Sequence, residues 1–470
     1  MRDAHAIKDA SREAADRLAE ADEVHLVGHI DADGLCAAGI ASRAMTEAGI
    51  PHEVTFVKTM GKPEAGDLLD ENPATAWMVD LGSGVADNFI DREWIIADHH
   101  EPPKGPEEGP NHHVNPHYWG LDGSVEVSGA GLTWGIARHL VDDETAGELA
   151  AMAIVGAVGD LQNAKANRLV GLNRSIVQYA SDALTVDPIR DVTLYGRETR
   201  ELHKFFQYAD DPEIPGVSGS ATAAIQFLAE HEVPRRDPDG EDRAWVHLDH
   251  DEKSRLISAA VRRVIANGEG SDAVRRLFGE VYQLPQEPVG TQLHDAKEFA
   301  TLLNSTARYD RADVGMALVK GDRDEALAEA HELMDGHRRA LVQGVDHVLD
   351  QGLERVGQLE YFHGEDHIRD TIVGIVAGMV SGRRQSDDDA VTVGFAHRSE
   401  NEVKVSTRAP KGLVSRGVKL SEAVADAAQS TGGEGGGHDG AAGATIPKGT
   451  ESDFLAALNR ALDHQLKARV

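Results

Sequence analysis

Residues 24–34, which read VHLVGHIDADG, constrain the fold of this chain more than any other stretch. They begin as an apolar strand pattern and end in His29, Asp31 and Asp33, and Gly34 then opens a helical pattern over residues 35–48. A strand that releases an imidazole and two carboxylates at its carboxyl end, just before a helix, is typical of the ligand-binding edge of a parallel sheet. We therefore interpret this stretch as part of a binding site.

The first 185 residues or so alternate between strand and helix patterns. Further strand patterns lie at residues 52–58, 76–82 and 93–100. A stretch rich in Pro, Gly and His, residues 101–127, is predicted to be a loop that ends at Ser128, a candidate helix N-cap. Two more helices are expected before residue 185. The alternation predicts an α/β fold in which a parallel sheet carries helices on both faces.

The pattern changes near residue 190, where charged helices with Pro and Gly breaks predict a mainly helical insertion. A long helix over residues 324–350 is expected to lead to a last, smaller α/β domain. The predicted division is therefore into residues 1–190, 191–340 and 341–470.

Two absences narrow the class of protein. No apolar stretch approaches the roughly 18 to 20 residues that span a bilayer, so we expect a soluble cytoplasmic protein without a membrane partner. Cys36 is the single cysteine, which excludes an internal disulfide and a cysteine-based metal cage.

The chain is strongly acidic, with a net charge of −33 over 470 residues, and only 14 of its 47 basic residues are lysines. Because the acidic residues are spread along the chain and 41% of residues are hydrophobic, the acidity belongs to the surface of a folded protein. This composition is typical of a halophile, since at about 1 M salt the Debye length is only about 3 Å. Arginine pairs are expected to attract phosphate in such a chain. They lie at residues 235–236, 262–263, 275–276 and 383–384.

Further candidate ligands follow the other apolar segments. Asp80 follows the run 77–79, Asp98, His99 and His100 follow the run 94–97, and Asp160 ends a helix of small residues. Like charges that converge on one sheet edge raise one another's pKa sharply, and divalent cations relieve that repulsion. Any one of these acids alone is more often a solvated strand end or a helix cap, but their joint occurrence indicates a metal site.

Oxygen and nitrogen ligands without sulfur favour Mn²⁺ or Mg²⁺ over structural zinc, and the imidazoles favour Mn²⁺. Two ions about 3.5 to 4 Å apart, bridged by a carboxylate, can activate water and stabilise an in-line displacement at phosphorus. The sequence therefore predicts hydrolysis of a phosphoester.

The run TGGEGGGHDGAAG near the C-terminus is a second constellation. Placed between two helices, Gly435, Gly436 and Gly437 would let backbone N–H groups approach a phosphate, and His438 would add a donor. The alternative is a flexible linker. Arg408, at a predicted strand end, suits a phosphate by its bidentate fork, although such an arginine is equally often a surface ion pair.

Together these motifs resemble those of the DHH phosphoesterase superfamily, and specifically of its RecJ-like nucleases. HIDADG, VDLG, ADHHEP and GAVGD resemble the four metal-binding motifs, and GGGHDGAAG resembles the signature of the DHH-associated domain. The resemblance covers about residues 1–185 and 356–470.

The resemblance implies a role for each candidate residue. Two Mn²⁺ ions are implied, one on His29 and Asp31, the other on Asp33, His99 and Asp160, with Asp80 as the bridge. His100 would contact the scissile phosphate, with Asp98 behind it. Nucleotide binding from the DHH-associated side, across a cleft between the domains, is implied for Ser406, Arg408, Gly435, Gly436, Gly437 and His438.

The function implied is that of a manganese-dependent exonuclease that acts on single-stranded DNA or RNA, 5′ to 3′ on DNA by family analogy. One alternative is a phosphodiesterase for short oligoribonucleotides or cyclic dinucleotides, because compact members of the superfamily do that too. Another is a replisome scaffold with a vestigial site. The helical insertion resembles that of archaeal RecJ-like proteins, some of which join the GINS complex of the replicative helicase, so GINS binding is a further hypothesis.

Overall fold

The structure is a computed structural model, and it describes residues 4–103, 105, 112–268, 270–382 and 390–467. It divides into two compact units, Met1–His331 and Glu332–Val470. The three-part division made from the sequence stays a prediction. Among the described residues, no helix combines the length and the apolar character needed to cross a bilayer.

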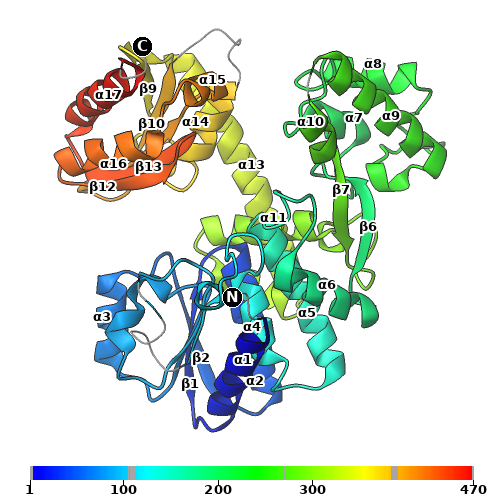
Figure 1. The fold of residues 1–470 in the computed structure, drawn as a ribbon. Helices are drawn as coiled ribbons and strands as arrows, with labels where there is room; N and C mark the ends of the chain where they lie inside the picture. The colour runs from blue at the N-terminus through cyan, green and yellow to red at the C-terminus, as the bar shows by residue number, and fades with distance from the viewer. Residues whose placement is uncertain (1–3, 104, 106–111, 269, 383–389, 468–470) are drawn as a thin grey trace. The chain divides into compact units, whose positions relative to one another are not determined.

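The first unit is built on a five-stranded parallel sheet, visible at the lower left of Figure 1. Its strands, in spatial order, are β2 (His52–Val57), β1 (Val24–His29), β3 (Ala76–Val79), β4 (Ile95–Ala97) and β5 (His112–Val114). All neighbouring pairs are parallel, so the carboxyl ends of β1, β3 and β4 lie at one edge of the sheet. The α/β fold class is confirmed.

Helices cover both faces of this sheet. On one face α3 (Lys62–Glu71) buries Ala65 and Leu68 against Val27, Met78 and Ile96 of the strands. The other face packs against α2, whose sole cysteine, Cys36, is fully buried. The helices of this domain are α1 (Ala4–Ala19), α2 (Ala32–Glu47), α3, α4 (Gly129–Ala137), α5 (Asp143–Gly159) and α6 (Gly171–Asp182).

Two details of the first domain test the sequence interpretation. Ser128 is the N-cap of α4, as predicted, and its hydroxyl accepts a hydrogen bond from Gly131 N at 3.1 Å. The prediction of an unbroken loop over residues 101–127 was wrong, because this segment contains β5. This strand has only three residues, two of them histidines, so it carries no apolar pattern that a sequence can reveal.

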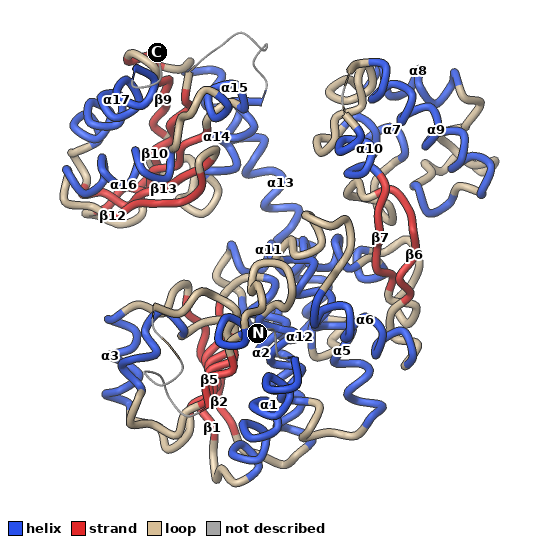
Figure 2. Tube along the Cα trace, viewed as in Figure 1, coloured by secondary structure: helices blue, strands red, loops and turns tan. Residues whose placement is uncertain are grey.

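The insertion is mainly helical, as predicted, but it is framed by an antiparallel ribbon that the sequence did not indicate. Strands β6 (Asp187–Val192) and β7 (Phe278–Gln283) form this ribbon. The chain between these two strands forms helices and loops, as Figure 2 shows. They enclose a separate core that contains Phe205, Phe227 and Trp245. The helices are α7 (Leu202–Gln207), α8 (Ala221–Glu230), α9 (His250–Ala266) and α10 (Ser271–Leu277). After β7, α11 (Ala296–Arg308) and α12 (Ala312–Val319) pack against α5 and α2.

The second unit contains a six-stranded mixed sheet. In spatial order the strands are β12 (Glu434–His438), β13 (Ala441–Pro447), β11 (Glu402–Arg408), β10 (Val391–His397), β9 (Leu359–His363) and β8 (Glu354–Val356). The predicted long helix is present as α13 (Glu325–Gln351). The other helices are α14 (Val373–Gly382), α15 (Lys411–Ser415), α16 (Leu420–Ser430) and α17 (Glu451–Lys467).

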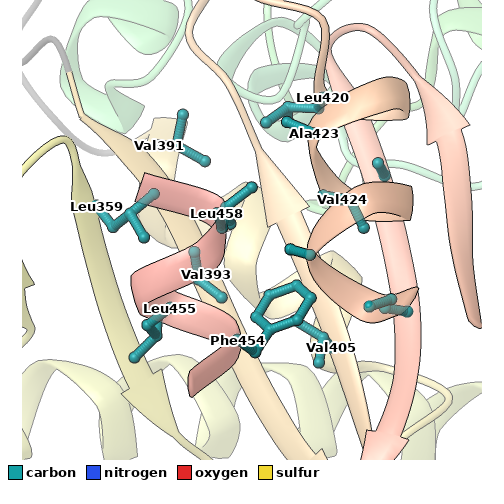
Figure 3. Close-up of a cluster of buried hydrophobic side chains, with 14 of the residues drawn as sticks. Leu359, Val391, Val393, Val405, Leu420, Ala423, Val424, Phe454, Leu455 and Leu458 are labelled. Atoms are coloured by element: carbon teal, nitrogen blue, oxygen red, sulfur yellow. The ribbon is translucent and has the colours of Figure 1, made fainter. Parts of the chain in front are cut away.

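Two amphipathic helices seal one face of this sheet. Figure 3 shows Phe454 and Leu458 of α17 and Val424 of α16 directed at Val393 and Val405 of the strands. These side chains are almost entirely buried, and each stabilises the fold by about 1.5 to 3 kcal/mol relative to an exposed position.

The glycine run was wrongly placed in a loop between two helices. It forms β12, an edge strand that pairs with β13. A Cβ added to Gly435 would lie 3.1 Å from the Cβ of Ala428 on α16, and Gly437 has a φ of +140°. Close helix packing and an unusual backbone angle therefore explain two of these glycines without any bound phosphate.

Candidate metal centre

The carboxyl edge of the parallel sheet brings together the ligands predicted from separate motifs. His29, at the end of β1, places Nδ1 3.2 Å from Asp31 Oδ2 and 3.3 Å from Asp80 Oδ2. His99, just beyond β4, places Nε2 3.3 Å from Asp80 Oδ1. Asp80 therefore lies between the two imidazoles.

Two other carboxylates face the same nitrogen of His99. Its Nε2 is 4.0 Å from Asp33 Oδ2 and 3.8 Å from Asp160 Oδ2. The ligand atoms form overlapping groups whose members all lie within 4.8 Å of one another. These groups are His29, Asp31 and Asp80; Asp33, His99 and Asp160; and Asp80, His99 and His100.

The donor set fits divalent cations. His29 Nδ1 and Asp80 Oδ1 are buried and lack any hydrogen-bond partner among the described residues. A buried polar atom without a partner costs about 1 to 3 kcal/mol, and a cation between these side chains would satisfy both atoms. Oxygen and imidazole ligands suit Mn²⁺ and, less closely, Mg²⁺.

The outer nitrogen of each imidazole is already occupied. His99 Nδ1 donates to Gly123 O at 2.7 Å, and His29 Nε2 donates to Lys58 O at 3.2 Å. These bonds direct the other nitrogen of each ring toward the carboxylates, which is how outer contacts usually orient metal-binding histidines.

The backbone at Asp80 is strained. Its φ is +62°, in the left-handed region, while its N–H donates to Ala97 O at 2.9 Å. This conformation costs of the order of 1 to 3 kcal/mol for a residue with a Cβ, and such strain concentrates at functional sites. The turn is what aims the carboxylate of Asp80 between His29 and His99.

Asp33 is held by the first turn of a helix. Its carboxylate accepts hydrogen bonds from Gly129 N at 2.7 Å and Ala130 N at 3.1 Å, at the positive end of α4. Burial, followed by the charges of Asp80 and Asp160, nevertheless raises the pKa of Asp33 well above its ordinary value. Bound cations would remove that repulsion.

The pKa of His29 also depends on burial and on the neighbouring carboxylates. Burial disfavours its charged form, but the adjacent carboxylates of Asp31 and Asp80 outweigh burial and raise the pKa to about 11. Without metal the imidazole therefore holds a proton, which a cation would have to displace.

Gln162 is a site residue that the sequence interpretation missed. Its Nε2 lies 2.9 Å from Asp160 Oδ2, 2.9 Å from Gly123 O and 3.1 Å from Val127 O, and the side chain is fully buried. It thus links the Asp160 ligand to the carbonyl that holds His99. A glutamine two residues after an acid gives no signal in a sequence.

Asp98 and His100 form a pair beside the ligands. Asp98 Oδ1 accepts from His100 Nδ1 at 2.7 Å, and its Oδ2 accepts from Ser83 N at 2.8 Å. Burial opposes the ionisation of Asp98, but the hydrogen bond with His100 outweighs it and lowers the pKa of Asp98. The same bond raises the pKa of His100, whose ring is 58% exposed.

The predicted substrate-binding residues lie in the second unit and share two rows of its sheet. Ser406 and Gly436 both pair with Gly443, and Arg408 and His438 both pair with Ala441. Directly paired residues point to the same face, so three of the predicted side chains and Gly436 share one face.

That face is partly covered by α14. A Cβ on Gly374 would lie 2.6 Å from Ser406 Oγ and 2.9 Å from Arg408 Nη2. Lys404, two residues before Ser406, belongs to the same face and was missed. Gly435 and Gly437 alternate with Gly436 and so point to the α16 side instead.

In three of the predicted arginine pairs, at least one of the two arginines forms an ion pair with a carboxylate. Ion pairs join Arg236 to Asp242, Arg263 to Glu230 and Arg276 to Asp211. The pair at 383–384 lies outside the described residues.

The edge of the parallel sheet gathers three imidazoles and four carboxylates in overlapping groups, an arrangement that suits divalent cations. Family comparisons agree. Residues 194–278 match the DHH-CID domain and residues 357–466 match the DHHA1 domain. These two segments therefore carry domains of DHH proteins, and the fold is similar to that of RecJ exonucleases.

The matches to individual proteins cover nearly all of this chain. An uncharacterized protein of Methanocaldococcus jannaschii is 28% identical over 452 residues, 94% of each chain. The structure of RecJ from Thermus thermophilus in complex with Mn²⁺ gives a TM-score of 0.58 at 17% identity, with 98% of this chain covered. This chain spans 55% of that RecJ chain.

The fold is also that of CDC45 from Entamoeba histolytica, with a TM-score of 0.64 at 12% identity and coverage of 97% of this chain and 99% of that one. At these identities the solved structures establish only that this chain shares its fold with RecJ and with CDC45.

Proposed function

We propose that this protein is a manganese-dependent phosphodiesterase that works as an exonuclease on single-stranded nucleic acid, 5′ to 3′ on DNA. The observation that carries the proposal is the convergence of His29, Asp31, Asp33, His99 and Asp160 around a shared carboxylate, Asp80. The fold shared with a RecJ that was solved with Mn²⁺, and also with Mg²⁺, supports it.

Two cations are proposed. His29 and Asp31 would hold one, Asp33, His99 and Asp160 the other, and Asp80 would be shared by both. When bound, such ions supply positive charge to the phosphate and lower the pKa of water.

The chain's own groups position the substrate. Because His100 Nδ1 is engaged by Asp98, its Nε2 is the nitrogen presented to a ligand, and the protonated ring would donate a hydrogen bond to a phosphate oxygen. The peptide groups of α4 fix Asp33, and Gln162 fixes Asp160, so neither carboxylate needs to reorganise when substrate arrives.

The second unit would bind the nucleotide. Ser406, Arg408 and His438 share a face with Gly436, which leaves the backbone open beside them because a Cβ on Gly436 would meet nothing within 4 Å. The planar guanidinium of Arg408 suits a phosphate in this setting.

The enzyme alternative is a phosphodiesterase for short oligoribonucleotides or cyclic dinucleotides, since the same metal centre would serve either substrate. The two differ in what lies beyond the scissile bond. A long strand needs contacts outside the metal centre, whereas a dinucleotide does not.

A scaffold is favoured by one observation, the shared fold with CDC45. The retention of both candidate ligand groups weighs against a vestigial site. GINS binding stays a hypothesis for the helical insertion, and failure of the two purified proteins to co-elute in molar KCl would remove it.

One assay separates these functions. End-labelled single-stranded DNA, single-stranded RNA, a dinucleotide and a cyclic dinucleotide are each incubated with Mn²⁺, using the wild type and Asp80→Ala. Mononucleotide release from one labelled end, lost in the variant, supports the exonuclease. Cleavage of the small substrates alone favours the alternative, and inactivity on all four favours the scaffold. Activity of Asp80→Ala near that of the wild type would refute the assignment of the metal centre.

A further inference from the structure

A pocket of about 350 Å³ lies where the loop after α5 meets the β6–β7 ribbon, outside the candidate metal centre. Its walls include Arg168 of the loop, Arg190 of β6, Arg275 of α10 and Phe278 of β7. We call it the arginine pocket; its strands carry the labels β6 and β7 in Figure 1. Three arginines around one hollow are unusual in a chain whose net charge is −33.

The loop that lines the pocket is fixed at both ends. Glu280 N donates to Asn167 O at 2.9 Å, and the Asn167 side chain donates to Arg275 O. At its other end the loop starts at Asp160, which Gln162 holds. Asn167 follows Asp160 by seven residues, so the two lie at most roughly 25 Å apart.

The positive charge of the pocket is largely uncompensated. In the described part of the chain, Arg168 and Arg190 are exposed and make no ion pair. Arg275 reaches Asp272 only at 3.7 Å, with both side chains over 70% exposed, and such a pair contributes little.

The acidic residue in the pocket wall is Glu280, and it is already engaged. It forms an ion pair with Arg174 and accepts a hydrogen bond from Tyr282 Oη at 2.8 Å. The arginines at 236, 263 and 276, by contrast, are matched by carboxylates within 3.1 Å. A polyanion is therefore the ligand that complements this surface.

An aromatic ring lies beside the charges. The guanidinium of Arg190 lies 5.6 Å from the ring centroid of Phe278. Cations that follow a phosphate backbone next to an aromatic ring are typical of surfaces that bind single-stranded nucleic acid. Between the metal centre and the pocket, the loop also exposes Lys165 and Leu161, the latter 66% exposed.

We propose that the arginine pocket binds the sugar–phosphate backbone of a single strand several nucleotides away from the scissile phosphate. The proposal rests on the proposed function, which it deepens by naming a long single strand as the substrate. A strand long enough to run along the loop from Asp160 reaches Arg168, Arg190 and Arg275, and a dinucleotide does not.

The test uses the full-length protein with Arg168, Arg190 and Arg275 all changed to Gln. The matched control changes three other exposed arginines, Arg236, Arg255 and Arg262, to Gln. Binding of a labelled strand of about 20 nucleotides, DNA or RNA, is measured by fluorescence anisotropy over a range of KCl concentrations in the Asp80→Ala background, so that the strand stays intact. Hydrolysis of the strand and of a dinucleotide is measured with Asp80 present.

We expect the Kd for the strand to rise by about tenfold. The slope of log K against log [KCl] should become shallower by about 2, because each lost phosphate contact removes about 0.7 from it. Dinucleotide hydrolysis should be unchanged, and the control should behave as the wild type. With strands of increasing length, the defect should appear only above the length that reaches the pocket.

Three results would overturn the proposal: unchanged strand binding, an equal loss of binding in the control, or a loss of dinucleotide hydrolysis. If the triple variant misfolds, a single Arg190→Gln variant is used instead. Normal strand binding by that folded variant would also overturn the proposal. If the wild type hydrolyses neither substrate, the proposed function fails, but the binding measurement still decides whether the pocket holds a strand.

Discussion

Gly129 lies against Asp80, so closely that a Cβ at position 129 would be 2.3 Å from Asp80 Oδ1. The first residue of α4 therefore has to lack a side chain for the carboxylate to occupy its place between His29 and His99. The same peptide also donates its N–H to Asp33. One glycine thus sets the positions of two candidate ligands from different motifs.

We expect Gly129→Ala to lower Mn²⁺ affinity by at least about tenfold, because the methyl group displaces Asp80 from both imidazoles. Isothermal titration calorimetry with MnCl₂ measures this directly. Gly66→Ala in α3 is the control, since its Cβ would meet nothing within 4 Å and should leave affinity unchanged. Equal affinities for the two variants would contradict the assigned position of Asp80.

Gln162→Glu removes the amide donor while it keeps the size of the side chain. The new carboxylate would face Asp160 Oδ2 and two carbonyl oxygens, so Asp160 should shift and the affinity for one of two ions should fall by about 10-fold to 100-fold. Metal content after dialysis, measured by atomic emission, should drop toward one ion per chain. A variant that retains two ions would show that Gln162 has only a structural role.

Asp98→Asn tests the pair that it forms with His100. The neutral amide no longer favours a protonated ring, and we expect kcat to fall by about 100-fold with the Mn²⁺ content unchanged. Loss of metal along with kcat would instead place Asp98 among the ligands. His113→Gln serves as a control for the network, because His113 Nε2 contacts Ser83 Oγ at 2.9 Å without touching His100.

Glu298, in α11, gives a prediction about stability. Burial, followed by the charge of Asp295, raises the pKa of Glu298 to about 7 from an ordinary value of 4.5. The folded protein therefore binds this proton more tightly than the unfolded chain does. Its contribution to the free energy of unfolding is fully present below about pH 4.5 and is lost, by about 3 kcal/mol, as the pH rises to 7.

Denaturant unfolding of the wild type and Glu298→Gln between pH 4.5 and 7.5, at constant KCl, measures that loss. As the pH rises across this interval, the free energy of unfolding of the wild type should fall relative to that of Glu298→Gln, since glutamine cannot ionise. A difference that is independent of pH would mean that Glu298 is ionised throughout.

The candidate metal ligands could be identified in the sequence because each follows an apolar strand or helix that ends at the same sheet edge. His29, Asp80 and His99 needed only that local rule and the parallel order of the strands. Gln162 could not be predicted, since its role depends on carbonyls at residues 123 and 127 that only the folded chain brings near. The sequence thus indicates which residues are candidate metal ligands, but not which neighbouring groups keep them in position.

Two of the failures in the fold have a similar origin, because in both the pairing of strands overrides local sequence preference. The β6–β7 ribbon joins segments about 90 residues apart, as in the pairing of Ile189 with Val281, and no local pattern announces such pairing. The glycine run was taken for a loop because glycine is depleted in strands. Its pairing with β13 and its packing on α16 override that preference.

The burial of Cys36 has a practical consequence. The thiol is fully enclosed, and burial raises its pKa well above the ordinary value, so a maleimide dye should leave it unmodified. A cysteine introduced in place of Leu161, which is exposed and directly follows Asp160, would then be the one reactive thiol in the described chain. Paramagnetic Mn²⁺ quenches a nearby fluorophore, so a dye at that position would report the arrival of metal in real time.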